Sequence, residues 1–288
     1  LDDKNPTVPY PKNSYRTYKG NNSVRNALKY SSNTIAVYII KYVLGTESAS
    51  LYLRQVGIDR PEDSENVSMA LGSFGKGMSA YEMAGAYAAF ANNGLYTEPY
   101  AYTRVLDING NVLLENKSQY VEVYKPETAF ILTDILKGVF TSGGTAAGSG
   151  LENMPAAGKT GTTDNNRDKW FCGYTRYYTA AVWYGYDNLL GLTTIPKDDQ
   201  KNAIRIWQDL MSRIHADKEE LDFIRPDGVI VMTVCPDSGQ KVSPYCPVAV
   251  REYFIPGALM NPSEQCTLHE PLPTPSPAPE PGLDQPGG

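Results

Sequence analysis

The amino-acid sequence predicts an α/β (α+β) domain, in which an antiparallel sheet is flanked by helices and accompanied by a helical subdomain. Helical patterns cluster between residues 23 and 94, and three strand-like runs joined by short polar turns follow between residues 155 and 187. A further helical pattern comes directly after these runs, so helices are available to cover the sheet. The chain of 288 residues, 41% of them hydrophobic, is long enough to bury one large core.

The helical subdomain is predicted from its caps. Ser23 can cap a short helix through Tyr30, and a break at residues 31–33 precedes an apolar helix that runs to about Leu44. Thr46 begins another helix, which ends at Gly57, a residue suited to the left-handed position after a helix.

Ser79 and Glu82 form a capping box at the start of a helix rich in small residues, which ends at the dipeptide 93–94. Two β-rich runs around Asn109-Gly110 predict a hairpin. Pro126, at a first-turn position, opens the next helix.

The strands of the sheet are predicted at residues 155–163, 168–176 and 178–187, and a helix with one apolar face follows at 202–214. Residues 229–235 predict one more strand. We therefore divide the chain into a main domain at 1–222, a small Cys-containing extension at 223–270, and a proline-rich tail at 271–288 for which the composition predicts disorder.

Charge and apolar length exclude several classes of partner. The net charge is -6 and no basic run interrupts it, which argues against binding of nucleic acid. The longest apolar run, residues 34–44, contains Lys41 and is too short to cross a bilayer.

The cysteines lie at positions 172, 235, 246 and 266, and Cys266 with His269 forms a C-x-x-H pattern. A zinc site can be built on this pattern, but no C-x-x-C accompanies it and the other spacings are long and irregular. A disulfide among the three C-terminal cysteines is favoured instead for a protein outside the cytosol. We therefore predict no metal and no cofactor.

Lys159-Thr160-Gly161-Thr162 is the segment with the clearest chemistry, and it has three interpretations. The first is a surface strand that carries a lysine. The second is a phosphate-binding loop, which is rejected because Asn153 stands where that loop needs its first glycine and because strands follow. The third is the K-T-G element of serine acyltransferases, which accompanies an S-x-N element such as Ser31-Ser32-Asn33 and an S-x-x-K element.

Four separated segments resemble the transpeptidase domain of class A penicillin-binding proteins. They are ALKYSSNTIAVYI, MALGSFGKGMSAYEMAGAYAAFANNG, TSGGTAAG and AAGKTGTTDNNRDKWFCGYTRYYTAAVWYGYD, and together they span residues 20 to 215 in the order of that family. The resemblance implies the penicillin-binding, serine β-lactamase-like transpeptidase fold. It also implies a D,D-transpeptidase that cross-links peptidoglycan stem peptides through a serine acyl-enzyme and that β-lactam antibiotics acylate.

The resemblance implies a role for each residue of the two elements. Lys159 would supply positive charge beside Ser31, Ser31 would pass a proton to the departing amine, and Asn33 would orient the substrate backbone. The substrate-binding residues would be Thr160 and Thr162, whose hydroxyls face the terminal carboxylate, and Gly161, which lets the substrate approach the strand. The Thr162 N–H would donate to the oxyanion, a contact worth roughly 3 kcal/mol. Trp170 on the next strand is expected to be a core or cleft-wall residue rather than a catalytic one.

The S-x-x-K element that would carry the nucleophile precedes S-x-N in this family, and the residues before Ser31 do not contain it. Two other matches, Ser73 with Lys76 and Ser238 with Lys241, follow S-x-N and are interpreted as chance. Because residue 1 is Leu rather than Met, we expect this chain to continue a longer protein whose upstream segment carries the serine.

The family further implies an N-terminal membrane anchor, a glycan-polymerising domain, and a location on the extracytoplasmic face of the cell membrane. A different class of function stays open, namely a non-catalytic cell-wall binding or scaffolding domain that keeps the site without turnover. The sequence upstream of Leu1 distinguishes the two, because the enzyme requires S-x-x-K there.

Overall fold

The computed structural model describes residues 11–15, 17–18, 20, 22–186, 194–258 and 262–269. The proline-rich tail predicted at 271–288 lies outside the described residues. The helices are α1 (Val24–Tyr30), α2 (Asn33–Tyr38), α3 (Thr46–Gln55), α4 (Ala80–Ala91), α5 (Pro126–Lys137) and α6 (Asn202–Ile214). The strands are β1 (Leu95–Tyr96), β2 (Arg104–Leu106), β3 (Val112–Glu115), β4 (Val121–Glu122), β5 (Ala157–Thr162), β6 (Asp168–Tyr174), β7 (Thr179–Gly185), β8 (Ile230–Val234) and β9 (Val250–Phe254).

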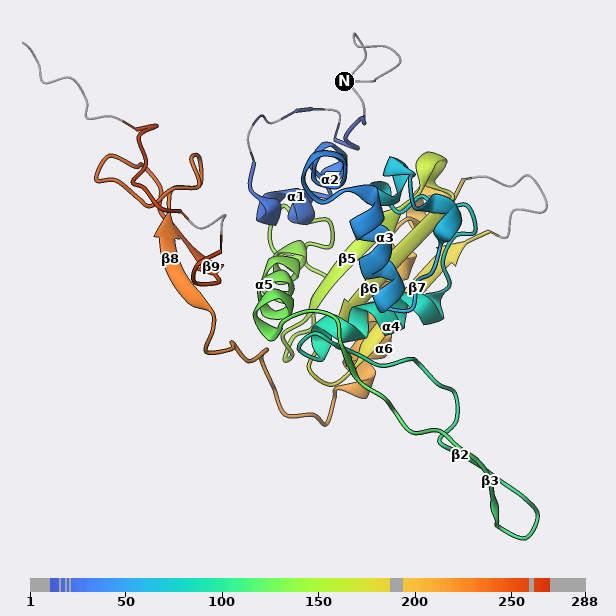
Figure 1. The fold of residues 1–288 in the computed structure, drawn as a ribbon. Helices are drawn as coiled ribbons and strands as arrows, with labels where there is room; N and C mark the ends of the chain where they lie inside the picture. The colour runs from blue at the N-terminus through green and yellow to red at the C-terminus, as the bar shows by residue number, and fades with distance from the viewer. Residues whose placement is uncertain are drawn as a thin grey trace, which may run out of the picture.

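The central sheet has the order β5-β6-β7 with antiparallel neighbours, so the three strands expected from the sequence are confirmed. The register pairs Lys159 with Cys172 and Gly161 with Trp170. Within the described part of the chain, β5 has a partner on one side alone and forms an edge of the sheet (Figure 1). An edge strand leaves alternate backbone N–H and C=O groups without a ladder partner.

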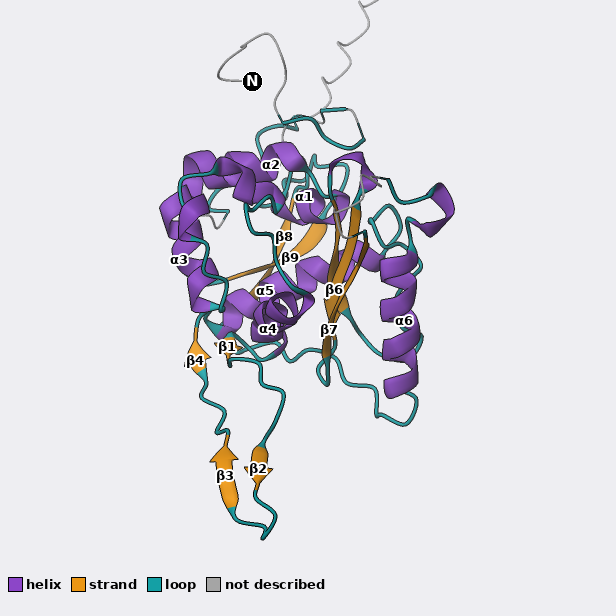
Figure 2. Ribbon diagram, turned by 90° about the vertical axis from the view of Figure 1, so that its right-hand side faces the viewer, coloured by secondary structure: helices purple, strands orange, loops and turns teal. Residues whose placement is uncertain are grey.

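The two faces of the sheet are covered by different helices. Figure 2 shows α6 on one side of β6 and β7, with α4 and α5 on the other. Phe171 packs edge-on against Trp207 of α6, with ring centroids 4.9 Å apart. Tyr174 faces the other side, where its hydroxyl lies 2.9 Å from that of Thr133 on α5. Alternation of side chains along β6 therefore sends one set of aromatic residues into each layer.

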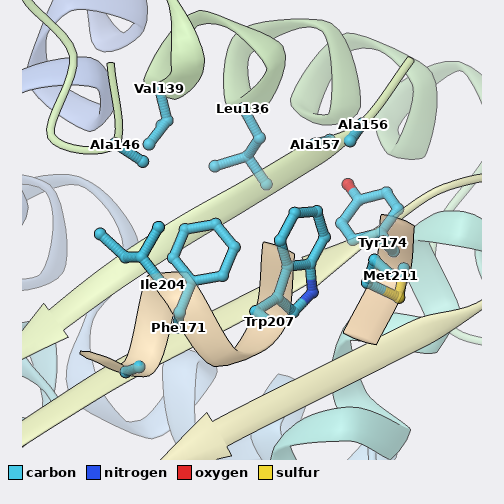
Figure 3. Packing of buried hydrophobic residues seen from close by; sticks show 11 residues of the cluster. Leu136, Val139, Ala146, Ala156, Ala157, Phe171, Tyr174, Ile204, Trp207 and Met211 are labelled. Carbon is cyan, nitrogen blue, oxygen red and sulfur yellow. The ribbon is translucent and has the colours of Figure 1, made fainter. Parts of the chain in front are cut away.

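Trp207 is the centre of the packing under α6 and is completely buried (Figure 3). Its indole N–H donates to the carbonyl of Gly173 over 3.1 Å. A Cβ on Gly173 would lie 2.7 Å from the Trp207 ring, so the close approach of α6 requires a glycine there. Burial of a large side chain of this kind contributes about 1.5–3 kcal/mol.

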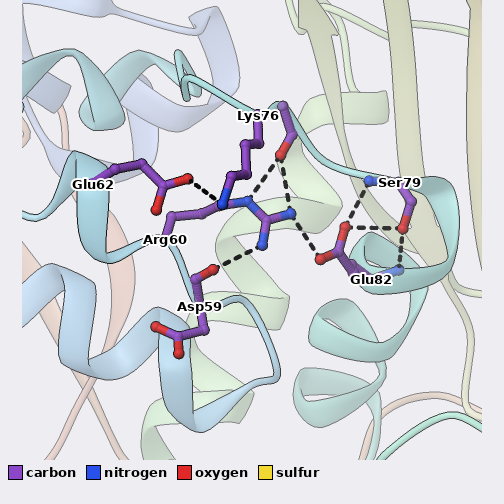
Figure 4. Close-up of polar contacts among 7 residues, drawn as sticks. Asp59, Arg60, Glu62, Lys76, Ser79 and Glu82 are labelled. Carbon is purple, nitrogen blue, oxygen red and sulfur yellow. Dashed lines mark hydrogen bonds and ion pairs between the residues drawn. The ribbon is translucent and has the colours of Figure 1, made fainter.

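The helical subdomain follows the caps that the sequence predicted. Ser23 accepts from the backbone N–H of Asn26, and Ser79 and Glu82 form the reciprocal capping box. The long apolar helix predicted through Leu44 consists of α2 and a π-helical turn, η1 (Ile39–Leu44). Arg60, which follows α3, connects to α4 through its guanidinium, which donates to Glu82 and to a backbone carbonyl (Figure 4).

The hairpin predicted around residues 109–110 is formed by β2 and β3, which project away from the sheet (Figure 1). Its strand residues are exposed along their whole length. None of the helices that the structure describes is long and apolar enough to cross a membrane.

The C-terminal strands β8 and β9 form a separate antiparallel pair beside α5 (Figure 1). The sequence predicted β8 and missed β9. Arg25 of α1 joins this pair to the main domain, since its guanidinium lies 2.6 Å from both Asp134 on α5 and Glu252 on β9. These hydrogen bonds outweigh the effect of burial and raise the pKa of Arg25.

Candidate active site

The junction between α1 and α2 positions Ser31. Its backbone is left-handed, with φ 56° and ψ 57°, and its N–H donates to the carbonyl of Leu28 over 3.2 Å. A residue with a Cβ pays roughly 1–2 kcal/mol for this conformation, and strain of this kind clusters at functional sites. The turn ends α1 abruptly and leaves the Ser31 hydroxyl facing β5.

Lys159 meets this hydroxyl from the sheet. Its Nζ donates to Ser31 Oγ over 2.8 Å and to the carbonyl of Thr160 over 2.8 Å. In the part of the chain that the structure describes, no carboxylate forms an ion pair with it. Burial lowers the pKa of Lys159 to about 8. Burial also raises the pKa of Cys172, its cross-strand neighbour, to about 12, so this thiol stays protonated.

Asn33, the third residue of the S-x-N element, makes no hydrogen bond to Lys159 among the described residues. It is the first residue of α2, and its side-chain amide donates to the carbonyl of Lys12 over 2.8 Å. The preceding residue, Ser32, is buried and lies within hydrogen-bond distance of Asn13 and Thr34. The structure therefore joins Ser31 and Lys159, while Asn33 contacts the N-terminal segment.

Thr160 contacts a residue that the sequence analysis did not assign to the site. Its hydroxyl donates to Thr145 Oγ1 over 2.7 Å. Thr145 belongs to the TSGGTAAG segment, and its backbone N–H donates to the carbonyl of Lys29 in α1. The segment resembles the family, but no pattern in its sequence distinguishes one threonine from another.

Thr162, which is exposed, accepts a hydrogen bond from a second lysine that the sequence analysis missed. Lys169 Nζ lies 3.3 Å from Thr162 Oγ1 and 2.8 Å from Asn166 Oδ1. Only 8% of the residue is exposed, and this burial lowers the pKa of Lys169. The cross-strand pairing of Lys169 with Thr162 brings the two together.

Gly161 has a steric role that is visible in the structure. A Cβ at this position would lie 2.8 Å from the Cβ of Trp170, its partner on β6. The glycine thus lets Trp170 lie across the strand, and the Trp170 residue is half-buried.

The two later S-x-x-K matches lie elsewhere. Lys76 is largely exposed and pairs with Glu62 over 3.2 Å (Figure 4). Ser238 lies in the turn after β8 and accepts from the backbone N–H of Gln240. Among the described residues, neither match makes a contact with Ser31 or Lys159.

A cavity of about 230 Å³ between α5 and β9 is also separate from this site. Asp134, Lys137 and Tyr253 line it, and neither Ser31 nor Lys159 does.

Comparison with known proteins agrees with this geometry. Residues 2–212 match the family model "Penicillin binding protein transpeptidase domain", and residues 225–271 match "Penicillin-binding protein 1A, C-terminal domain". A penicillin-binding protein 1A of Clostridium botulinum is 37% identical over 271 residues, which is 91% of this chain and 32% of that protein. Penicillin-binding protein 1A of Clostridium tetani is 37% identical over 279 residues, 91% of this chain and 34% of its own. The chain thus spans about a third of the length of these relatives.

Among solved structures, penicillin-binding protein 1A from Haemophilus influenzae covers 89% of this chain at a TM-score of 0.76 and 24% identity, and this chain covers 43% of it. PonA1 from Mycobacterium tuberculosis in complex with penicillin V covers 75% at a TM-score of 0.63 and 24% identity, with 62% of its own chain covered. At these identities the likeness establishes the fold.

Proposed function

This chain belongs to the penicillin-binding protein transpeptidase family, and from that premise we propose that it forms the larger part of a peptidoglycan D,D-transpeptidase site. The reaction would cleave the D-Ala-D-Ala end of a stem peptide, form a serine acyl-enzyme, and pass the acyl group to an amine of a neighbouring stem. β-Lactam antibiotics would acylate the same serine, and the site would act on the extracytoplasmic face of the cell membrane.

The observation that carries this proposal is the hydrogen bond from Lys159 Nζ to Ser31 Oγ. When the scissile amide breaks, the departing D-Ala amine needs a proton. Ser31 Oγ–H donates that proton and takes one from Lys159 Nζ in return, which leaves Lys159 neutral. The acceptor amine returns a proton through Ser31 to Lys159 when it attacks the acyl-enzyme. A lysine with a pKa of about 8 is a stronger acid than one with an ordinary pKa, which suits this transfer near neutral pH.

Substrate binding is proposed along the open edge of β5. The unpaired backbone groups of an edge strand pair readily with an extended peptide, as in β-strand addition. The hydroxyls of Thr160 and Thr162 would donate to the terminal carboxylate, and the Thr162 N–H would donate to the oxyanion. Asn33 would orient the substrate backbone after leaving the Lys12 carbonyl, to which it now donates.

The nucleophilic serine and its base lysine are proposed to belong to a segment of the same protein upstream of Leu1. In the part of the chain that the structure describes, neither later S-x-x-K match contacts the Ser31–Lys159 pair, and no carboxylate forms an ion pair with Lys159. This chain would then supply two walls of a three-walled site.

The test is the intact mass of the chain after incubation with excess benzylpenicillin. We expect no adduct on this chain alone, and one adduct on the longer protein, located upstream of Leu1. Lys159→Ala in the longer protein should slow acylation, whereas Lys117→Ala, at an exposed hairpin position, should not. An adduct on Ser73 or Ser238 would contradict the assignment, and a longer protein that is never acylated would identify a binding or scaffolding domain instead.

A further inference from the structure

The C-terminal unit around β8 and β9 brings together side chains that the sequence left apart. One ligand atom from each of Cys235, Cys246, Cys266 and His269 lies within 4.8 Å of the others. The disulfide expected among these cysteines is not formed, since all four cysteines of the chain are free. We propose that these four side chains form a structural zinc site.

The distances within the cluster fit one zinc ion. His269 Nδ1 lies 3.6 Å from Cys235 Sγ and 3.5 Å from Cys266 Sγ. Zinc–sulfur and zinc–nitrogen bonds of about 2.3 and 2.0–2.1 Å place sulfur and nitrogen about 3.6 Å apart at the corners of a tetrahedron. Three thiolates and one imidazole also form a ligand set that favours zinc. Together they occupy all four coordination positions of a structural zinc site.

The imidazole is oriented for metal binding by a carboxylate. His269 Nε2 lies 3.3 Å from Asp237 Oδ2, while its Nδ1 faces the two sulfurs. A proton held on Nε2 by Asp237 leaves the Nδ1 lone pair free for the ion, as in the carboxylate–histidine–zinc arrangement of many zinc proteins. A disulfide would use two of the three sulfurs, and it would not require this orientation of the His269 imidazole.

The backbone holds the three contributing segments in place. The N–H of Cys235 donates to the carbonyl of Gln240, which closes the turn after β8. Lys241 follows, and its carbonyl accepts from the N–H of Cys266 over 2.8 Å. Cys246 Sγ accepts from the backbone N–H of Ser243 over 3.3 Å, a contact that stabilises a thiolate.

The unit needs a cross-link because its apolar core is small. In the described residues after 224, the buried apolar side chains other than the cysteines and Pro262 are Val229 and Val234. Cys235 is completely buried and Cys266 is 4% exposed, so the two sulfurs occupy the centre of the unit. A two-stranded hairpin of this size is marginal in water, and small units of this kind are stabilised by metals or disulfides.

The first experiment measures zinc in the chain purified without chelator and in matched cysteine variants. We expect one zinc ion per chain, loss of the ion in Cys266→Ser, and full zinc content in Cys172→Ser, whose thiol lies in the central sheet. Less than about a tenth of an ion per chain after reduction and reconstitution with zinc sulfate would overturn the proposal. A mapped disulfide among the three cysteines of the purified chain, or full zinc content in Cys266→Ser, would overturn it as well.

A second measurement does not depend on the variants' folding. Cobalt(II) added to the metal-free wild-type chain should give the intense visible bands of tetrahedral coordination and a thiolate-to-cobalt charge-transfer band, and zinc should abolish both. Absence of these bands would contradict a thiolate site. Asp237→Ala should weaken zinc affinity about 10- to 100-fold in competition with a coloured chelator, whereas the exposed Asp227→Ala should leave it unchanged.

Discussion

Lys159 Nζ lies 2.8 Å from Ser31 Oγ, although 128 positions separate the two residues in the sequence. The contact joins an edge strand to the turn between two short helices, so it reports directly on how the helical subdomain sits against the sheet. The contribution of this contact to stability depends on the charge of Lys159, which is half-buried and has no carboxylate ion-pair partner in the part of the chain that the structure describes.

Replacement of Lys159 by methionine should change how stability depends on pH. The folded lysine releases its proton near pH 8 and the unfolded one near pH 10.5, so the unfolded state binds more protons between these values. The wild-type chain should therefore gain up to about 3 kcal/mol relative to Lys159→Met as pH rises from 8 to 10.5, with a constant difference below pH 8. Urea unfolding at pH 7, 9 and 10.5 checks this, and parallel pH profiles would contradict the lowered pKa.

Two substitutions at Ser31 separate its backbone from its hydroxyl. Both Ser31→Gly and Ser31→Ala remove the hydroxyl, but glycine adopts φ 56° freely while alanine does not. We expect Ser31→Gly to be the more stable variant by about 1 kcal/mol. Denaturant unfolding compares them. Equal stabilities would mean that the left-handed turn relaxes once the contact to Lys159 is gone.

Gly161→Ala should disturb the sheet, because the new Cβ would lie 2.8 Å from the Cβ of Trp170. We expect a loss of about 1–3 kcal/mol, the usual cost of overpacking. Gly138→Ala is the matched control, since its Cβ would meet no atom within 4 Å and its backbone is right-handed. Thermal unfolding of both variants, with tryptophan fluorescence as a local probe, measures the difference. A tolerated Gly161→Ala would show that the two strands can separate at this point.

Removal of Arg25 should loosen the C-terminal unit. Arg25→Ala leaves Asp134 and Glu252, each with about a quarter of its side chain exposed, without their shared cation. Loss of one partner from a partly buried pair of this kind costs about 3 kcal/mol, reduced here by the remaining exposure. The rate of backbone hydrogen exchange in β8 and β9 should therefore be higher in Arg25→Ala than in the wild-type chain.

The control for Arg25 is Arg54→Ala. Its partner is Asp59, and more than half of each side chain is exposed, so its loss should change stability by less than about 1 kcal/mol. Unchanged exchange in β8 and β9 of Arg25→Ala would show that other contacts, such as the ring pair of Phe130 and Tyr253, suffice to hold the unit.

Local chemistry predicted the elements whose ends are set by neighbouring residues. The caps at Ser23 and Ser79, the proline that opens α5, and the turn at Asn109-Gly110 all occur as expected. Strand β9 was missed because Val250–Phe254 carries charged residues at two of its five positions and becomes a strand by pairing with β8. Propensity gives no signal for a partner 20 residues away.

Site residues could be predicted where they belong to a sequence motif of the family. They could not be predicted where their contacts depend on a loop conformation or on the register between strands. Ser31 and Lys159 were found, whereas Thr145 and Lys169 reach the site through a loop and a cross-strand pair. The cysteine cluster was missed for a related reason. Its ligands come from segments that are irregularly spaced in the sequence, and backbone hydrogen bonds such as those from Cys235 to Gln240 and from Cys266 to Lys241 bring them together.

The open edge of β5 has a consequence for handling the protein in solution. A strand that is free to receive an extended peptide is equally free to receive the same strand of a second molecule. The strand is short, and the proton of Lys159 gives it a charge that opposes such pairing until the pH exceeds about 8. Concentrated samples should therefore self-associate more in alkaline than in neutral buffer, and a short peptide that occupies the edge should keep them dispersed.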